Sequence, residues 1–503
     1  MSPSVGTVAA KSESPKSRSS NPASRMAAPP QPREAGLSGV FQAGGGVRTR
    51  LREVDNPWPM RHRIGKSLRD RTPRESHSDG HPADDRPDPL DLLAASNVGR
   101  QEDLVPLRMG RMSASPFTFL RGAACVMAWD LSRSPDSGIR VIIDGDAHIN
   151  NFGLYGTPQR DVIFDLNDFD EATVGPWEWD LKRLAASVNV AARENGINKA
   201  ERGAAVRRAV EGYRWCVGRM ESMGVLDVWY EHAYPDTKNP LLKRDPKAQA
   251  LIGKAVAKAR TQTNAMLLRK SAERSPSGGL RLREDPPIQT RVDNKTREKV
   301  IQGLEEYAAA LSPERFFMLN RYHVVDVVHR VVGVGSVGTR AYLALLMGND
   351  DNDPLFLQVK ECASPAHAPY VPPLPKQFEH HGKRVVMGQR ALQASSDIML
   401  GPTTVDGRPF FVRQMRNMKA SIPVEWLTGE TFNFYAQACG ALLGRAHARS
   451  GDAAAIAGYC GRSRTLDKTL ATLAEAYGDQ TEQDHAHLVQ AIKSGKVKAI
   501  TGV

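Results

Sequence analysis

The residues best suited to chemistry lie between Val141 and Lys182, where two apolar segments each run into a polar, acid-rich stretch. The first leads to Asp146 and, five positions later, to Asn151; the second leads to a carboxylate cluster that includes Asp168. Kinase-like phosphotransferases hold a general base and magnesium with an Asp, an Asn five residues on, and an acidic strand end. This spacing predicts phosphoryl transfer, with Asp146 as the base that accepts a hydroxyl proton.

The metal ligands are expected close to this base. Magnesium takes hard oxygen ligands and keeps several of its waters, so a few carboxylate and amide side chains suffice to bind it. Asn151 and Asp168 are therefore expected to bind the metal, with Asp165 as a further ligand. A helix is expected to begin at Asp180 and to end before Gly196, because apolar side chains recur on one face: Leu181, Leu184, Ala185, Val188 and Ala192.

Two other interpretations of this stretch stay open. The carboxylates are also typical of a solvated turn in a surface hairpin. The string from Asp144 to His148, Asp-Gly-Asp-Ala-His, could instead be part of a binuclear metallophosphoesterase, in which Asp and His bind two metal ions. That class needs further His and Asn ligands in loops, and the downstream histidines lie in no such loop. Phosphotransfer is therefore favoured, and the role of His148 stays open.

A glycine-rich segment follows far downstream. Gly333, Gly335 and Gly338 form a G-x-G-x-x-G string with Ser336 inside it. In dinucleotide-binding proteins this string opens a helix, whereas here an apolar run, a polar turn and a second apolar run ending in Lys360 follow. Strand, glycine loop, strand, turn, strand is the order found in kinases, where the loop covers the ATP phosphates and the lysine reaches them. We expect these five residues to bind a nucleotide.

An acidic partner for this lysine is not visible in the sequence. The helix that would supply it is expected over residues 382–400 and contains no Glu; Glu379 lies just before it and Asp397 near its end. The segment over 407–415 is expected to be a strand that runs into a hinge, where Met415 would offer backbone groups to adenine.

The motifs stand in an unusual order, because the expected base precedes the glycine loop. In an ordinary kinase the glycine loop and the lysine come first. Either the two motifs are unrelated, or the chain is a circular permutation of a kinase-like fold, which is possible when the original termini lie close together at the surface. The permutation hypothesis requires Lys360 and Asp168 to share one cleft.

Several strings resemble the bacterial family catalogued as domain of unknown function 2252. They begin at Arg108, Phe119, Gly145, Asp165, Gly175, Val332, Gln358 and Gly388, and the resemblance covers roughly residues 60–495. The family is grouped with protein-kinase-like folds, near the aminoglycoside and choline phosphotransferases. The resemblance therefore implies a two-lobed, kinase-like α+β fold that uses ATP and Mg²⁺. Where the family pattern has an acidic helix residue, this chain has Met387.

The length of 503 residues allows two lobes. We expect a disordered basic leader at 1–85, a helical catalytic lobe at 86–319, a strand-rich nucleotide-binding lobe at 320–420, and C-terminal helices at 421–503 that pack on the catalytic lobe. The leader is rich in Ser, Pro, Gly and Arg and lacks periodicity, which is typical of disorder.

Composition limits the classes of partner that the protein is expected to bind and the cell compartment in which it is expected to work. The net charge of +12 suits an anionic nucleotide or substrate. The basic leader lacks interleaved aromatic residues that would stack on bases, so nucleic acid is not expected as a partner. The 5 cysteines are scattered, no signal-peptide pattern is seen, and no apolar run approaches the length of a membrane span. A cytoplasmic protein is expected.

The expected function is ATP- and magnesium-dependent phosphotransfer to an unknown small-molecule or protein hydroxyl. Two alternatives stay open on the same residues. One is nucleotidyl transfer, and the other is a pseudokinase-like regulatory module that binds a nucleotide without transferring a group.

Overall fold

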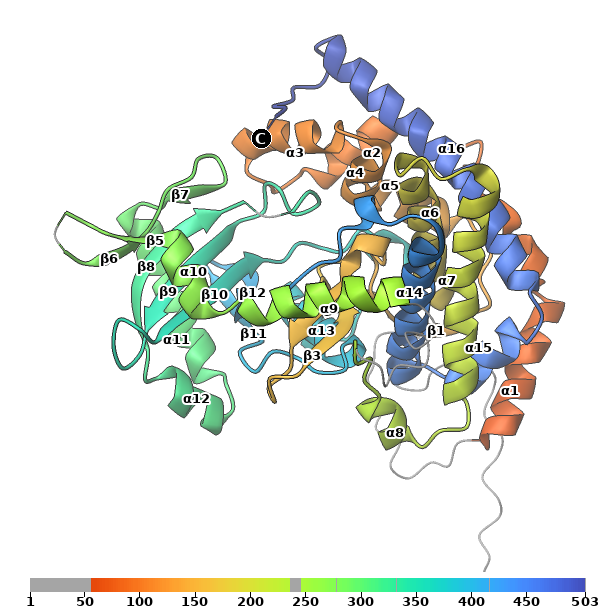
Figure 1. Cartoon of the computed structure of the whole chain (residues 1–503). Coiled ribbons are helices and arrows are strands. Elements are labelled where there is room, and N and C mark those ends of the chain that lie inside the picture. The colour runs from red at the N-terminus through yellow and green to blue at the C-terminus, as the bar shows by residue number, and fades with distance from the viewer. Residues whose placement is uncertain (1–55, 236–245, 277, 332, 416, 503) are drawn as a thin grey trace, which may run out of the picture.

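The computed structural model describes residues 56–235, 246–276, 278–331, 333–415 and 417–502. The fold is mixed α and β, as expected, with the largest sheet on one side of the molecule and the long helices on the other (Figure 1). No helix in the described ranges combines the length and the apolar character needed to span a membrane.

A six-stranded sheet forms the strand-rich side, in the order β11-β12-β10-β9-β8-β7, and every neighbouring pair is antiparallel. Its strands are β7 (Gln289–Arg291), β8 (His323–Arg330), β9 (Ala341–Met347), β10 (Pro354–Glu361), β11 (Gly401–Val405) and β12 (Arg408–Gln414). The glycine-rich segment connects β8 to β9. The polar turn between β9 and β10 closes the next hairpin, so the predicted order of strand, glycine loop, strand, turn, strand is confirmed.

Alternate side chains of the sheet enter two separate cores, because successive residues of a strand point to opposite faces. Leu357 packs on one face with Tyr307 of α11 (Asn294–Ala309). Its neighbour Phe356 packs on the other face with Leu267 of α10 (Asn264–Ser271). The sheet is thus covered on both sides, which keeps the strand that ends near Lys360 rigid.

The acid-rich stretch forms two short antiparallel strand pairs, one nested within the other in the sequence. Strand β1 (Arg140–Ile143) pairs with β4 (Thr173–Pro176), and between them β2 (Phe152–Gly156) pairs with β3 (Val162–Leu166). The loop between β1 and β2 contains the 3₁₀ turn η4 (Ile149–Asn151). Helix α6 (Trp177–Glu194) follows β4 and contains the expected helix from Asp180 onward.

Four long helices build the opposite side: α6, α7 (Lys199–Met220), α14 (Gly429–Ser450) and α16 (Thr465–Lys493). Helices α7 and α14 cross at close range, because a Cβ atom on Gly440 would lie 1.8 Å from the carbonyl oxygen of Ala209. Helix α13 (His381–Leu392) contacts β11 and β12 as well as α14, so it links the sheet to the helices.

The remaining helices have between 6 and 16 residues. They are α2 (Pro89–Ser96), α3 (Val105–Met112), α4 (Pro116–Gly122), α5 (Ala124–Ser132), α8 (Val225–Tyr230), α9 (Pro246–Thr261), α12 (Pro313–Leu319) and α15 (Ala453–Cys460). Strands β5 (Ala272–Arg274) and β6 (Leu280–Leu282) form a separate two-stranded hairpin.

Two boundaries differ from expectation. Helix α1 (Trp58–Ser67) and two 3₁₀ turns lie inside the predicted leader, and α1 packs on α15 through glycines: a Cβ on Gly65 would lie 1.9 Å from the backbone of Ala455. Gly65 and Ala455 lie far apart in the sequence, so local composition does not reveal their contact. Residues 1–55 lie outside the described ranges. The helix expected over 382–400 ends at Leu392, where the backbone of Gln393 becomes extended.

Candidate active site

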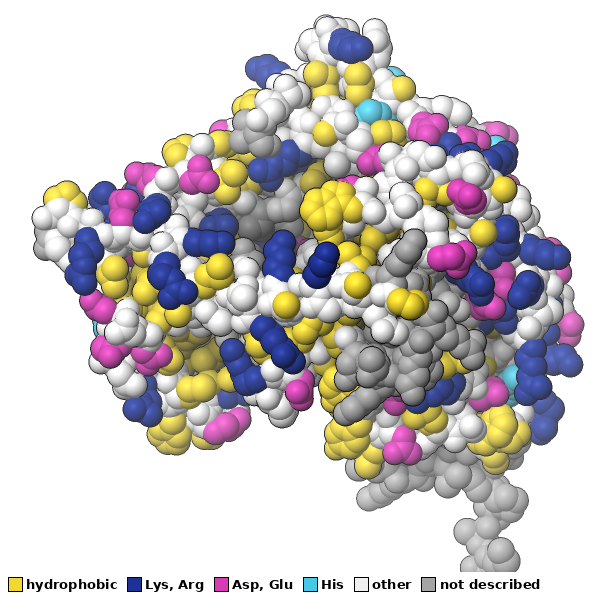
Figure 2. Space-filling view, viewed as in Figure 1, with side chains coloured by type: hydrophobic (Ala, Val, Ile, Leu, Met, Phe, Trp, Pro, Cys, Tyr) yellow, Lys and Arg dark blue, Asp and Glu magenta, His cyan; other side chains and the backbone are white. Residues whose placement is uncertain are grey.

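A cleft lies between the sheet and the acidic hairpins. Its main cavity has a volume of about 820 Å³, and a smaller one of about 220 Å³ adjoins it beneath the glycine loop. Asp168, Gly333 and Ser336 line both. The two motifs found in the sequence therefore share one cleft, as the permutation hypothesis requires. Lys and Arg side chains lie over α9 and α10 beside it (Figure 2).

The glycine loop needs glycine at specific positions and is held from outside the sheet. Gly333 has φ +66° and Gly338 has φ +88°, a region that side chains with a Cβ rarely adopt. Arg111 donates to the carbonyl of Gly333 at 2.7 Å, and Arg100 donates to the carbonyl of Val337 at 2.7 Å. The segment around α3 thus anchors a loop more than two hundred residues downstream.

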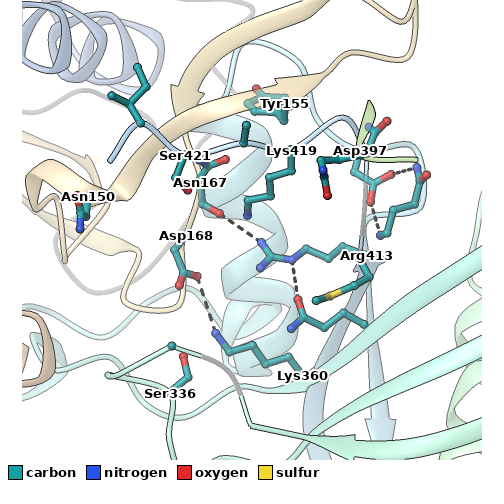
Figure 3. Close-up of a pocket in the computed structure, with 18 of the residues that line it drawn as sticks. Asn150, Tyr155, Asn167, Asp168, Ser336, Lys360, Asp397, Arg413, Lys419 and Ser421 are labelled. Carbon is teal, nitrogen blue, oxygen red and sulfur yellow. Dashed lines mark hydrogen bonds and ion pairs between the residues drawn. The ribbon is translucent and has the colours of Figure 1, made fainter. Parts of the chain in front are cut away.

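Lys360 points from β10 into the cleft and is paired with carboxylates of the acidic stretch. Its side chain is 2% exposed; its ammonium group bonds Asp170 and lies 3.9 Å from Asp168, as Figure 3 shows for the latter pair. The Ser336 hydroxyl donates to Asp170 at 3.3 Å. Burial would lower the pKa of Lys360, but Asp168 and Asp170 raise it above its usual value, so the side chain is a cation.

The acidic partner of this lysine comes from the hairpin and not from α13. Met387 of α13 packs on the large hydrophobic core, Glu379 is exposed, and Asp397 accepts hydrogen bonds from the backbone and side chain of Gln414. Asp170, two residues beyond Asp168, is the carboxylate that bonds Lys360. The sequence contained this residue but gave no sign that it would reach Lys360.

Asp168 presents its carboxylate to the cleft. The side chain is 47% exposed, and no hydrogen bond to its Oδ2 is formed within the described ranges. Burial would raise its pKa, but Lys360, Arg413 and Lys419 outweigh that effect and lower the pKa to about 2. Asp168 is therefore a carboxylate at any physiological pH and is suited to bind a cation.

Asn151 holds the acidic loop together. Its amide oxygen accepts the backbone N–H of Asp168 at 2.9 Å, and its amide nitrogen donates to Asp144 at 2.9 Å. The oxygen expected to bind metal thus uses one of its two lone pairs to fix the position of Asp168. The preceding residue, Asn150, lines both cavities, and Asn151 itself lines the smaller one.

Asp146 lines the smaller cavity at hydrogen-bond distance from Arg183, whose Nη2 lies 2.7 Å from its Oδ1. Burial raises the pKa of Asp146 to about 7, although Arg183 lowers it in part. Burial, with Arg121 and Arg183, holds the pKa of His148 well below its usual value; this ring is neutral and lies 3.8 Å from the other oxygen of Asp146. A carboxyl group that ionises near neutrality suits a general base.

The loop that carries Asp146 is fixed by Asp180 at the start of α6. The carboxylate of Asp180 accepts the backbone N–H groups of Asp144 at 2.7 Å and Gly145 at 2.9 Å. Gly145 has φ +79°, and a Cβ there would lie 2.2 Å from the carbonyl oxygen of Glu171. The turn between strand and base therefore requires glycine.

Two predicted site residues have other roles. Asp165 is buried and forms an ion pair with Arg445 of α14. It also accepts a hydrogen bond from the backbone N–H of Ala394 at 2.8 Å. Because these contacts lie away from the cleft, Asp165 is no longer assigned as a metal ligand. Met415 lines the main cavity, but its N–H donates to the carbonyl of Phe356 at 2.9 Å and is not available to adenine.

Further residues complete the cleft wall without having been predicted. Arg413 donates to Gln358 at 3.0 Å and to the carbonyl of Asn167 at 3.3 Å, and so bridges the sheet and the hairpin (Figure 3). Side chains from α13 and β12, Gln389 and Gln414, add amide groups. Their signal in the sequence is weak, because an Arg or Gln at the end of a strand is common on any surface.

A magnesium ion fits the open face of this site. Within the described ranges no three His, Cys, Asp or Glu residues form a closed metal-binding group. Magnesium does not need one, since it is usually held by one or two carboxylates together with waters and phosphate oxygens. Asp168 offers an exposed carboxylate, Asp170 has a buried Oδ1 with no hydrogen-bond partner, and Asn150 offers an amide oxygen.

Comparison with known proteins places the chain in a family. The profile of the family described as "Uncharacterized protein conserved in bacteria (DUF2252)" matches residues 100–491. No curated protein and no solved structure gives a significant match. The matched range includes both hairpins of the acidic stretch, the glycine loop and Lys360. Since the match covers most of the 503 residues, the chain belongs to the bacterial family DUF2252.

Proposed function

We propose that this protein is an ATP- and magnesium-dependent phosphotransferase with a circularly permuted kinase-like fold, acting on a hydroxyl group of a small molecule or protein. The sheet supports the fold assignment. Its glycine loop joins the adjacent strands β8 and β9, its lysine lies on the next strand, and α13 follows that strand. Kinases place a glycine loop, a lysine and a helix in the same order.

The observation that carries the proposal is the meeting of Lys360, Ser336 and the Asp168–Asp170 segment in one cleft. These groups come from parts of the chain 166 to 190 positions apart, and they combine a phosphate-binding lysine with carboxylates suited to magnesium. Bound magnesium neutralises the charge of the transferred phosphoryl group. Asp168, Asp170 and Asn150 would hold the ion.

The chain's own residues have separate tasks in the reaction. The acceptor hydroxyl gives its proton to Asp146 as its oxygen forms a bond to the γ-phosphorus. The bond between that phosphorus and the oxygen bridging it to the β-phosphate breaks, and ADP leaves. Lys360 and the backbone of the glycine loop hold the phosphates, while Asp180 and Gly145 fix the loop that carries the base.

The central experiment compares wild type with Asp146→Asn and Lys360→Ala. Calorimetric titration with MgATP and measurement of ADP formation should separate binding from turnover. Asp146→Asn is expected to bind MgATP with near wild-type affinity and to lose turnover, whereas Lys360→Ala is expected to bind more weakly. Wild-type protein that neither binds MgATP nor gains thermal stability from it would refute the proposal.

Two alternatives have supporting observations. Lys360 has no acidic partner on α13, and the Asn151 oxygen is already hydrogen-bonded, which favours a module that binds a nucleotide without transfer. Nucleotidyl transfer would use the same cleft. Label incorporated from γ-phosphate-labelled ATP, but not from α-phosphate-labelled ATP, supports phosphoryl transfer; the reverse supports nucleotidyl transfer; binding without either supports the regulatory module.

A further inference from the structure

Three arginines on the consecutive helices α3 and α4 occupy different environments. Arg108 is buried and donates to the side chain of Asn97 and to the carbonyl of Gly122, so it is structural. Arg111 donates to the glycine loop. Arg121 makes no hydrogen bond or ion pair within the described ranges, and its guanidinium carbon lies 6.0 Å from the ring centroid of Phe117. Its Nε is buried without an acceptor.

The position of Arg121 is central to the cleft. It lines both cavities, together with Asp168 and Ser336. The tip of the glycine loop lies next to the backbone of Arg121, because a Cβ on Gly335 would be 3.5 Å from the carbonyl oxygen of Arg121. Because Arg121 and the glycine loop line the same smaller cavity, a ligand whose phosphates lay in that cavity would come close to the guanidinium group.

The charge balance of the cleft distinguishes Arg121 from its neighbours. Lys360 is paired with Asp170, and Arg183 is paired with Asp146. Burial lowers the pKa of Arg121, and the negative charges of Asp146 and Asp168 raise it only in part. A partly buried guanidinium without a hydrogen-bonding partner is unfavourable unless an anion binds it. Its planar donor group matches phosphate oxygens.

We propose that Arg121 is a catalytic residue that donates hydrogen bonds to the phosphoryl group while it passes from ATP to the acceptor. This inference rests on the proposed function. As the bond to the acceptor oxygen forms and the bond to the ADP oxygen breaks, negative charge spreads over the equatorial phosphoryl oxygens, and Arg121 stabilises it. An arginine supplied to that position from the same chain has the same effect in some nucleotide hydrolases.

The test compares Arg121→Gln and Arg121→Lys with wild type. The control is Arg133→Gln, which alters an exposed arginine at the end of α5 that pairs with Asp85 at 3.5 Å on the surface. For each variant, kcat is measured from ADP formation, Kd from calorimetry with MgATP, and the melting temperature from thermal unfolding. Arg121→Gln should lower kcat about a thousandfold and raise Kd less than about tenfold. Arg121→Lys should retain part of the rate, because it keeps the charge but loses the planar donor group.

Each of the following results would overturn the catalytic role of Arg121. A kcat for Arg121→Gln within about fivefold of wild type, in a protein with an unchanged melting temperature, would overturn the role of Arg121 and leave the phosphotransferase proposal intact. A loss of affinity as large as the loss of rate would make Arg121 a ground-state phosphate ligand and also overturn it. If Arg121→Gln fails to fold, a folded Arg121→Lys with wild-type kcat overturns it as well. Wild type that binds MgATP without turnover refutes both proposals.

Discussion

At the scale of single residues, the ionisation of Asp146 makes a sharp prediction. Its pKa is about 7 in the folded protein, against a usual value of 3.8, because burial raises it more than Arg183 lowers it. The base must be deprotonated, so kcat/KM should rise as pH passes through about 7 and level off above it. By linkage, the folded chain holds this proton more tightly than the unfolded chain. The shift therefore lowers stability as pH rises from about 4 to about 7.

Arg183→Gln tests the cause of that pH dependence. Removing the guanidinium group removes a charge that lowers the pKa of Asp146, so the ascending limb of the pH–rate profile should move to higher pH. Arg208→Gln, which removes an exposed arginine paired with Glu211, should leave the limb in place. Identical profiles for wild type and Arg183→Gln would contradict the assignment of the limb to Asp146.

Asp165 gives the second residue-scale prediction. Its pairing with Arg445 is almost entirely buried. Asp165→Asn removes the charge and leaves a buried guanidinium unpaired, so the free energy of unfolding should fall by about 3–5 kcal/mol. Chemical denaturation measures this loss. The double variant Asp165→Leu/Arg445→Met should recover much of it, because no buried charge then remains. A small loss, with weaker magnesium dependence of turnover, would restore Asp165 to the metal site.

Residue types and spacing singled out Asp146, Asp168, Lys360 and the glycine loop, because each motif is local, and all of them line the cleft. They did not predict the pairing of Asp170 with Lys360, or the use of the Asn151 oxygen by a backbone N–H. Both contacts depend on which side-chain oxygen lies next to which hydrogen-bond donor in the folded chain. The four acidic residues between positions 165 and 171 do not reveal these contacts by their order in the sequence.

At the scale of elements, the glycine loop should depend on Gly338. Its φ is +88°, and a Cβ would lie 3.1 Å from the side chain of Arg100. Gly338→Ala therefore strains the loop, at a cost of about 1–2 kcal/mol. MgATP binding measured by calorimetry should weaken about tenfold, provided that the strain is relieved by displacing the loop.

A matched glycine on a neighbouring helix provides the control. A Cβ on Gly253 of α9 would meet no other atom within 4 Å, and the φ of this residue is not positive. Gly253→Ala should leave MgATP affinity unchanged and stabilise the helix slightly. Equal affinities for the Gly338 and Gly253 variants would mean that the loop does not bind the nucleotide.

Elements with strong local patterns were predicted, whereas those that depend on distant contacts were not. The strands on either side of the glycine loop and the helix from Asp180 follow from apolar periodicity. Helix α1 was missed because its burial depends on Gly65 meeting α15, about four hundred positions away. The end of α13 at Leu392 was placed eight residues too late, because apolar residues continue to Leu400 in a non-helical segment that packs in the core.

At the scale of the whole molecule, the order of the motifs means that one chain crosses between the two sides of the cleft several times. The acidic hairpins come first, the sheet follows, and α14 returns to pack on α7. The C-terminal residues then reach the segment that anchors the glycine loop, where the N–H of Ile500 donates to the carbonyl of Pro106 at 2.9 Å. The order of the motifs in the sequence suggested that the chain crosses the cleft in this way. The three-dimensional contacts show that the two motifs lie together.

The shared cleft predicts a specific pattern of hydrogen exchange. MgATP should slow amide exchange at the same time in peptides covering 333–340 and 162–170, because one ligand would contact both segments and suppress the local opening of each. Peptides covering α1 and α15, which contact each other away from the cleft, should be unaffected. In Lys360→Ala the protection should decrease in both cleft segments together. Protection confined to one segment would show that the glycine loop and the acidic hairpin do not act on a common ligand.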